Sequence, residues 1–362
     1  MNLPDNFFCQ MIRGNGLSVG ETEYITEVYE EFGREGITGL IKNRKITPFA
    51  ARTFTELGID KEYWSGIMEE YCERNRKILT YLNKAYEALE AHGVRKIFVT
   101  ENFGALLSAD GDISLFASGD VDNCADISEK EKIYAAFESL GFKRRERFAV
   151  NNQIAATFHP KDSEIGDDFY ISVDFHPLAR LKLPCFVNAD DFIDWNKLYR
   201  YRDTSIKLPP ADALLYICLL HISLHSFSRA PGIRLYTDLL NMSKLDIDFN
   251  IIKEWAERDN TQNRISVSSY ISNQLMKTAY PADLTDIGKK RDKILKIVYD
   301  RHKNNLTGEP GGLKVLLIEL LCNDKGIGHG IHELLMPDKE WVKSTYGSTG
   351  IFAYMRHFFR II

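Results

Sequence analysis

Asp120-Val121-Asp122 and, further along, Tyr170-Ile171-Ser172-Val173-Asp174-Phe175-His176 are the two stretches that decide the fold. Alternate side chains of an extended segment point to the same face, so Asp120 and Asp122 are expected to lie side by side. Two adjacent carboxylates repel each other unless a cation lies between them. Mg²⁺ accepts carboxylate oxygens and leaves room for water and substrate phosphates. We therefore expect Asp174, on a neighbouring strand, to complete a metal site with this pair.

The composition argues against several classes of protein. The chain has 362 residues, long enough for more than one domain with a sizeable core. Hydrophobic residues make up 44% and charged residues 27%, as in ordinary globular proteins. The 46 basic and 51 acidic residues give a net charge of -5, which gives no reason to expect a nucleic-acid or membrane partner. No apolar run approaches the ~20 residues that a bilayer requires.

The N-terminus and the cysteines predict a cytoplasmic protein. Residues 1–21 mix charged with apolar side chains and contain no continuous apolar segment, so we expect no signal peptide. The six cysteines form no CxxC pair, which argues against a zinc knuckle or a redox motif. Buried free thiols in a reducing compartment are the simplest interpretation.

Changes in periodicity divide the chain into three predicted regions. Residues 1–92 form an N-terminal helical region, because apolar residues recur at three- and four-residue spacing up to the C-cap signal His92-Gly93. Residues 93–203 form a core that contains the strands. Residues 204–362 form a C-terminal helical domain, which opens with a helix over 212–227 that is apolar almost all round. The prediction is an α+β fold with a small mixed β-sheet between two helical regions.

The core is expected to read β-α-β-α-β-β. Its predicted elements are a strand at 96–100, a turn and helix at 102–108, a strand reached through 114–122, a helix over 129–140, and strands at 148–158 and 168–175. Gly104 would allow close approach of the backbone at the first turn. Ser128 is the expected N-cap of the second helix, and Gly141 its end.

A basic run, Lys143-Arg144-Arg145-Glu146-Arg147, has two interpretations. The first is the solvated edge of a hairpin, which charged side chains protect from aggregation. The second is a surface that attracts a phosphate or an anionic acceptor. The sequence favours the first.

The stretch from about Val94 to Arg258 resembles a bacterial nucleotidyltransferase family with a polymerase-β-like core. The residues that carry the resemblance are Gly104-Ala105-Leu106-Leu107, Gly119-Asp120-Val121-Asp122, Val173-Asp174-Phe175-His176, His221, His225, Arg234 and Tyr236-Thr237-Asp238. Members of this family often accompany biosynthetic genes for polysaccharides or modified peptides. The resemblance implies transfer of a nucleoside monophosphate from an NTP such as ATP, dependent on Mg²⁺ or Mn²⁺.

Motif and resemblance together predict the site. Asp120, Asp122 and Asp174 are the expected metal ligands and catalytic carboxylates, with Asp174 as the general base. The nucleotide is expected to contact Gly104, Ser108, Ser118, Gly119 and His176. The acceptor would be a small molecule, a sugar or a peptide, with no nucleic acid and no membrane involved.

The chain departs from the family pattern at two positions. Where the family often has Lys before the first Gly, this chain has Phe103, and where it commonly has Arg, four residues before the first Asp, this chain has Phe116. Both missing cations are of the kind that holds triphosphate charge. Retained carboxylates without these cations indicate a divergent enzyme or an unusual donor.

Two alternatives stay open at this point. The first is a catalytically degenerate nucleotidyltransferase that serves as a nucleotide- or peptide-binding module. The second is a metal hydrolase built on His221 and His225, which lie one helical turn apart, a spacing that can bind zinc. Because no HExxH glutamate accompanies them, histidines of a core or polar network are the preferred interpretation, and they would pin the helical region to the catalytic one through Asp238.

Overall fold

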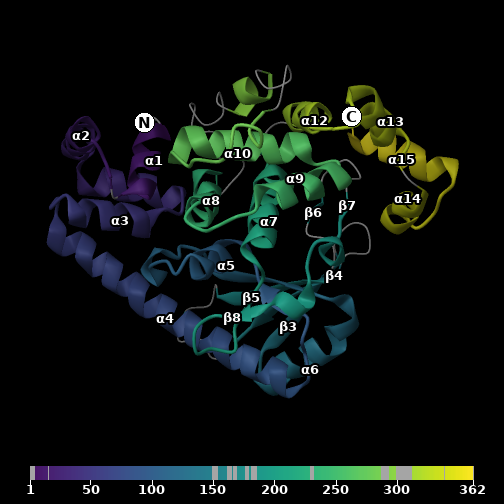
Figure 1. Ribbon diagram of the computed structural model, residues 1–362, viewed down its shortest axis with the longest axis horizontal. Coiled ribbons are helices and arrows are strands. Elements are labelled where there is room, and N and C mark those ends of the chain that lie inside the picture. Colours follow the sequence, from purple (N-terminus) through teal and green to yellow (C-terminus); the bar gives the residue numbers. More distant parts are fainter. Residues whose placement is uncertain are drawn as a thin grey trace.

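The computed structural model describes residues 5–14, 16–148, 154–160, 165, 169–175, 179–180, 186–228, 232–286, 293–298, 312–337 and 339–361. Figure 1 shows a small mixed β-sheet enclosed by many helices, which confirms a mixed α+β architecture.

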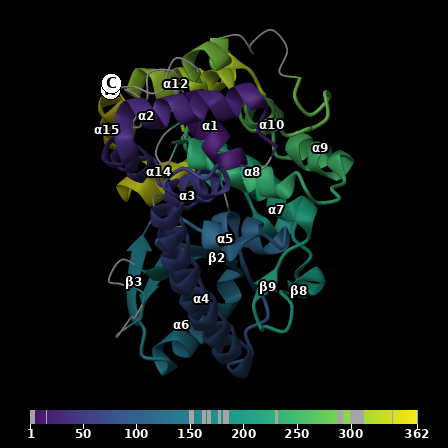
Figure 2. The same cartoon turned by 90° about the vertical axis from the view of Figure 1, so that its left-hand side faces the viewer.

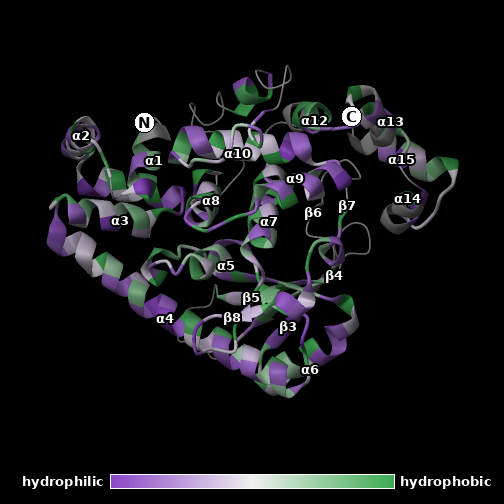
Figure 3. Cartoon of the chain, viewed as in Figure 1, coloured by the Kyte–Doolittle hydropathy of each residue, from purple (hydrophilic) through white to green (hydrophobic). Residues whose placement is uncertain are grey.

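Four helices open the chain: α1 (Asp5–Arg13), α2 (Val19–Asn43), α3 (Thr47–Glu56) and α4 (Lys61–Ala91). The last of these extends from the N-terminal helices along one side of the sheet (Figures 1 and 2). Hydrophobic and hydrophilic residues alternate along it (Figure 3), as one buried face requires. It ends as the sequence predicts, with His92 as C-cap and Gly93 at φ 73°.

The central sheet has five strands: β1 (Ile97–Val99), β2 (Asp120–Ala125), β3 (Lys143–Phe148), β4 (Ile154–His159) and β5 (Tyr170–Phe175). Their order is β1-β2-β5-β4-β3, with β2 and β5 parallel and every other neighbouring pair antiparallel. The basic run at residues 143–147 therefore lies on the edge strand β3, which agrees with its interpretation as the edge of a hairpin.

Between the strands lie α5 (Glu101–Ser108), η1 (Ile113–Leu115), η2 (Ile127–Glu129) and α6 (Lys130–Ser139). Three details differ from the sequence prediction. The single strand expected at 148–158 is two antiparallel strands, β3 and β4, so three strands rather than two follow α6. The helix α5 starts directly at Glu101, one residue before the expected turn. Asp126 rather than Ser128 provides the cap, because its side chain accepts a hydrogen bond from the Ser128 backbone N–H and opens η2 before α6.

The chain then forms two short ribbons and a helical assembly. The short elements are β6 (Ala179–Arg180), β7 (Phe186–Val187), η3 (Ala189–Asp191), η4 (Trp195–Lys197), β8 (Tyr199–Arg200) and β9 (Lys207–Leu208). The helices are α7 (Ala211–Leu224), η5 (Gly232–Leu235), α8 (Tyr236–Met242), α9 (Phe249–Arg258), α10 (Gln262–Met276), α12 (Gly312–Leu321), α13 (Ile327–Leu335), α14 (Lys339–Tyr346) and α15 (Ile351–Ile361). None of the helices in the described part of the chain combines the length and apolarity that crossing a membrane demands.

The two faces of the sheet contribute to two different cores. Val121 and Val173 point to one face and pack in a cluster with α4 and α6. Cys124 points to the opposite face and joins a larger cluster built on α7. The acidic residues of β2 share this second face with Cys124, because they alternate with Val121.

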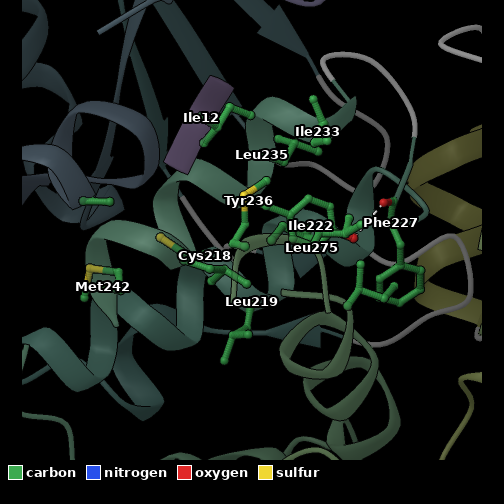
Figure 4. Close-up of a cluster of buried hydrophobic side chains, with 14 of the residues drawn as sticks. Ile12, Cys218, Leu219, Ile222, Phe227, Ile233, Leu235, Tyr236, Met242 and Leu275 are labelled. Atoms are coloured by element: carbon green, nitrogen blue, oxygen red, sulfur yellow. Dashed lines mark hydrogen bonds between the residues drawn. The ribbon is translucent and has the colours of Figure 1, made fainter. Parts of the chain in front are cut away.

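The helical core is centred on α7, whose side chains are buried almost all round, as the sequence predicts. Figure 4 shows Cys218, Leu219 and Ile222 of this helix packed with side chains of η5, α8 and α10. The Tyr236 hydroxyl donates a hydrogen bond of 2.8 Å to the Phe227 carbonyl, which satisfies the buried polar atoms at the end of α7. This rigid assembly carries His221 and Arg234 towards the sheet.

A glycine controls how closely α5 approaches β1. A methyl group on Gly104 would lie 2.7 Å from the Val99 carbonyl oxygen. We expect Gly104→Ala to destabilise the protein by ~1–3 kcal/mol because backbone must shift. Gly66→Ala, in open space on α4, is the matched control and should stabilise it by ~0.5–1 kcal/mol. Urea unfolding of both variants measures this, and equal effects would contradict the close packing of α5.

Candidate active site

The parallel pairing of β2 with β5 brings the predicted carboxylates to one face of the sheet. Asp120 pairs with Tyr170, Asp122 with Ser172, and Cys124 with Asp174. Asp174 therefore lies on the adjacent strand two residues beyond Ser172, the residue opposite Asp122, and faces the same side of the sheet. The alternation predicted from sequence places all three carboxylates at the boundary between the sheet and the C-terminal helices.

Asp120 is held in a fixed orientation by two hydroxyl groups. The Ser118 hydroxyl donates to one of its oxygens, and the Tyr170 hydroxyl donates to the other at 3.0 Å. Ser118 is itself anchored, because its carbonyl accepts a hydrogen bond of 2.7 Å from Arg74 of α4. The loop before β2 is thus tied to both α4 and β5, and Asp120 enters the site with a defined side-chain position.

Asp122 is in a different electrostatic environment. Within the described part of the chain its carboxylate accepts no hydrogen bond. Burial raises the pKa of Asp122 well above its usual range, and the negative charges of Asp120, Glu101 and Asp174 raise it further. His221 opposes this shift. The site therefore holds an excess of negative charge centred on one unsatisfied carboxylate.

Asp174 is the exposed member of the three carboxylates. Its charge acts on Asp122, which shows that the two belong to one electrostatic cluster. The three side chains do not converge by themselves on a common point: among the described residues, no three His, Cys, Asp or Glu side chains are arranged to hold a metal ion. The three predicted residues lie on one face of the sheet, and the register places Asp174 two residues further along than the position opposite Asp122. Their role as metal ligands stays a prediction.

Glu101 is a site residue that the sequence did not reveal. It is the first residue of α5 and has φ 46°, a left-handed conformation that is unfavourable for a side chain of this type. Thr100, just before it, donates its backbone N–H to the Asp122 carbonyl at 2.9 Å. Glu101 lies 2.9 Å from His221 Nδ1. An acidic residue at the first helical position is a common helix signal, so only its strained backbone marks it as special.

His221 links the C-terminal helices to this site. Burial opposes its protonation, but the charge and hydrogen bond of Glu101, with smaller contributions from Asp238 and Asp122, raise the pKa of His221 to about 9. The imidazole is therefore a cation at neutral pH. The expected partner was Asp238, and this is corrected: the direct contact of His221 is Glu101, while Asp238 acts on it only through its charge.

Arg234 provides a second cationic contact from the helical region. It donates a hydrogen bond of 2.6 Å to the Asn102 side-chain oxygen, in the first turn of α5. Burial raises the pKa of the neighbouring Asp238 to about 7, although Arg234 and His221 lower it. The Arg234 Nε atom is buried and has no hydrogen-bond partner among the described residues. Two cations of the helical region therefore contact two successive residues at the start of α5.

The predicted nucleotide contacts are spread over a wider area. Ser108 lies at the opposite end of α5 from Glu101, about 10 Å away along an eight-residue helix. Its hydroxyl accepts a hydrogen bond of 3.3 Å from Tyr199. Gly104 packs against the Val99 carbonyl, and Gly119 lies directly beside Asp120. His176 lies outside the described residues.

The two aromatic residues at the departures from the family pattern are in contact. Phe103 and Phe116 are both buried, and their ring centroids are 4.6 Å apart. Of the positive groups, His221 acts on Asp122, while Arg234 bonds Asn102 and acts on Asp238.

The histidine pair is not arranged as a zinc site in this structure. The rings of His221 and His225 lie edge to face with centroids 4.8 Å apart. The Nδ1 atom of His221 is occupied by Glu101. As no suitable group of three metal-binding side chains exists in the described ranges, the polar-network interpretation of these histidines is the better one.

Comparison with known proteins gives one distant structural match. No protein-family model matches the chain, and a search of curated proteins finds no significant match. Among solved structures, the antibiotic-resistance factor ANT(2'')-Ia, an aminoglycoside nucleotidyltransferase, matches with a TM-score of 0.35 and 11% identity, over 51% of this chain and 91% of that chain. The resemblance to the bacterial family stays a prediction.

The Glu101–His221 contact predicts a dependence of stability on pH. His221 binds its proton more tightly in the folded chain, with a pKa of about 9 against 6.5, so its contribution is complete below pH 6.5 and is lost as pH rises through 9. Glu101→Gln should flatten this slope, which can reach ~1.4 kcal/mol per pH unit. Urea unfolding from pH 6 to 10, with a chelator present, measures it.

The matched control is Glu257→Gln, which removes an exposed carboxylate on α9 and should leave the slope as in the parent chain. Asp238 also makes the protein less stable as the pH rises, but at lower pH than His221 does. Its pKa is raised to about 7 in the folded chain, so its buried carboxyl is destabilising once it ionises. An unchanged slope in Glu101→Gln between pH 7 and 9 would show that His221 is not held as a cation by Glu101.

Proposed function

We propose that this chain is a metal-dependent nucleotidyltransferase, which transfers a nucleoside monophosphate from an NTP to an acceptor and releases pyrophosphate. One observation carries the proposal. Asp122 is recessed and accepts no hydrogen bond from the described residues. The negative charges of Asp120, Glu101 and Asp174 act on it. A carboxylate in this environment is costly unless a cation joins it. An NTP brings such a cation as its magnesium complex.

The donor set agrees with Mg²⁺ or Mn²⁺ rather than with a softer metal. Mg²⁺ is usually held by one or two protein carboxylates, while water and substrate phosphates complete its octahedron. Asp120 and Asp122 would be these ligands, so a third converging side chain is not required. The bound ion would neutralise phosphate charge and polarise the α-phosphate. The hydroxyls of Ser118 and Tyr170 would orient the Asp120 oxygens for this contact.

The residues of the chain supply the remaining parts of the reaction. Asp174 is exposed and lies on the strand next to Asp120 and Asp122. It would accept the proton of the acceptor nucleophile. The nucleophile would form a bond to the α-phosphorus as the bond from this phosphorus to the bridging oxygen breaks, and pyrophosphate would leave. Ser118 and Gly119 lie beside Asp120 and would contact the phosphates. His221 and Arg234 would offset the negative charge around the departing group.

The acceptor is proposed only as a class: a small molecule, a sugar or a peptide with a nucleophilic oxygen or nitrogen. A catalytically degenerate protein that binds the nucleotide without turnover is the alternative. Pyrophosphate release separates the two, since a binding module would show NTP-dependent thermal stabilisation without any release. The buried Phe103 and Phe116, where the family has cations, are the observation that keeps this alternative in view.

Loss of either β2 aspartate should abolish turnover. We expect Asp120→Asn and Asp122→Asn to lower pyrophosphate release with Mg²⁺ and each of the four NTPs by at least ~10²-fold, because a metal ligand is lost without change of shape. Asp246→Asn, at an exposed position between α8 and α9, is the matched control and should keep full activity. Full activity of both site variants would remove them from the catalytic centre.

Stability gives a second readout that does not need an acceptor. In metal-free protein, Asp122→Asn should raise the unfolding temperature, because it removes a charge from the cluster that raises the pKa of Asp122. Addition of Mg²⁺ with an NTP should stabilise the parent chain and leave the variant unchanged. Thermal unfolding of both, with and without metal, measures this, and a variant less stable than its parent without metal would contradict the charge excess.

A further inference from the structure

A pocket of about 370 Å³ lies at the opposite end of β1 from the aspartates. Its walls come from the end of α4, the segment before β1, η4 and β9, and its main lining residues are Glu90, Arg95, Trp195, Asn196 and Lys207. This volume is within the range of small-molecule sites, ~300–1,000 Å³. The pocket is walled by segments far apart in the sequence, so it exists only in the folded chain.

Lys207 is fixed at one wall of this pocket. Its ammonium group donates to the Val94 and Arg95 carbonyls, at 3.5 and 3.3 Å. An ammonium has three donors, so one stays available for a ligand. No ion pair joins Lys207 to an acidic side chain in the described part of the chain. Burial lowers the pKa of Lys207, and the nearby charges of Arg200 and Arg95 lower it further, while Glu90 and Glu129 raise it.

Arg95 is the second cation of the pocket. Its side chain is exposed and makes no hydrogen bond or ion pair with the described residues. The acidic residue of the pocket does not neutralise it, because Glu90 is bound by Arg200, at 2.8 and 2.9 Å, and by the Ser205 hydroxyl. Two cationic side chains therefore line one cavity, and neither forms an ion pair with an acidic side chain of the described residues.

Trp195 gives the pocket an aromatic wall. Its indole N–H donates to Asp190 at 2.7 Å, and its ring packs on Phe98 with centroids 5.6 Å apart. The ring is thus held in place before any ligand arrives, which lowers the entropic cost of binding. Asn196 follows directly and adds a side-chain amide to the lining.

We propose that this pocket binds a small phosphate monoester whose apolar or planar body lies against Trp195. Two cations without an acidic partner match a phosphate monoester, which carries a charge of ≈ −1.5 to −2 at neutral pH, better than a carboxylate, which carries only one. The pocket is separate from the proposed metal site. Arg95 lies before β1 and Thr100, bonded to Asp122, lies after it, and the three-residue strand between them is itself about 10 Å long.

Calorimetric titration of the full chain with phenyl phosphate, benzoate and inorganic phosphate tests the proposal. Phenyl phosphate should bind at least tenfold more tightly than either of the others, because it alone combines the dianion with a ring. Lys207→Met and Arg95→Gln should each weaken its binding at least tenfold. Arg95→Gln keeps the test valid if Lys207→Met fails to fold, since the Arg95 side chain is exposed.

Two controls separate this pocket from other anion-binding surfaces. Lys197→Met, on the same 3₁₀ helix as Trp195 and 72% exposed, should bind phenyl phosphate like the parent chain. Asp122→Asn should also bind it normally, so the result does not depend on the proposed transferase activity. Absence of binding at millimolar phenyl phosphate, unchanged binding in Arg95→Gln, tighter binding of benzoate, or loss of binding in Asp122→Asn would overturn the proposal.

Discussion

The parallel pairing of β2 with β5 is the constraint on which the rest of the site depends. Because side chains alternate along each strand, this register sends Val121 and Val173 into one core and the acidic side chains to the opposite face. A shift by one residue would bury Asp122 among α4 and α6, at a cost far above that of any contact in the core. The apolar alternation of the two strands thus fixes the position of the charges, and folding of the sheet assembles the site before any ligand binds.

The helical region stabilises this excess of negative charge. Without cations, the repulsion among the carboxylates would favour separation of the sheet from α7. His221 and Arg234, both carried by the rigid core around α7, reach the first two residues of α5 and bring positive charge to that interface. Glu101 is held in a left-handed backbone conformation at the same point. The contact with His221 offsets the cost of this backbone conformation. Strained backbone of this kind is common at functional sites.

Sequence reasoning could predict the parts of this structure that depend on local patterns. The strands β1, β2 and β5, the end of α4 at Gly93 and the buried α7 follow from periodicity and turn chemistry. The prediction of one strand at 148–158 was wrong, because β3 and β4 are separate strands of one antiparallel pair. The helix α10 is hard to recognise from sequence because four of its buried residues, Ser266, Ser268, Ser269 and Ser272, are polar and conceal the apolar period. Ser268, for example, donates a hydrogen bond of 2.8 Å to the Leu219 carbonyl. The role of Glu101 depends on a backbone angle and on a histidine 120 positions later, neither of which a local pattern contains.

The two departures from the family pattern are one structural change rather than two. Phe103 and Phe116 lie on different segments, yet their rings pack together in the core beside α5. A cation at one position would leave a charge against an aromatic ring in a buried setting, which is costly unless an anion accompanies it. Exchange of one ring for a cation would therefore require a change at the other position as well. Positive charge reaches Asp122 from His221 of α7, and the carboxylate cluster still holds an excess of negative charge.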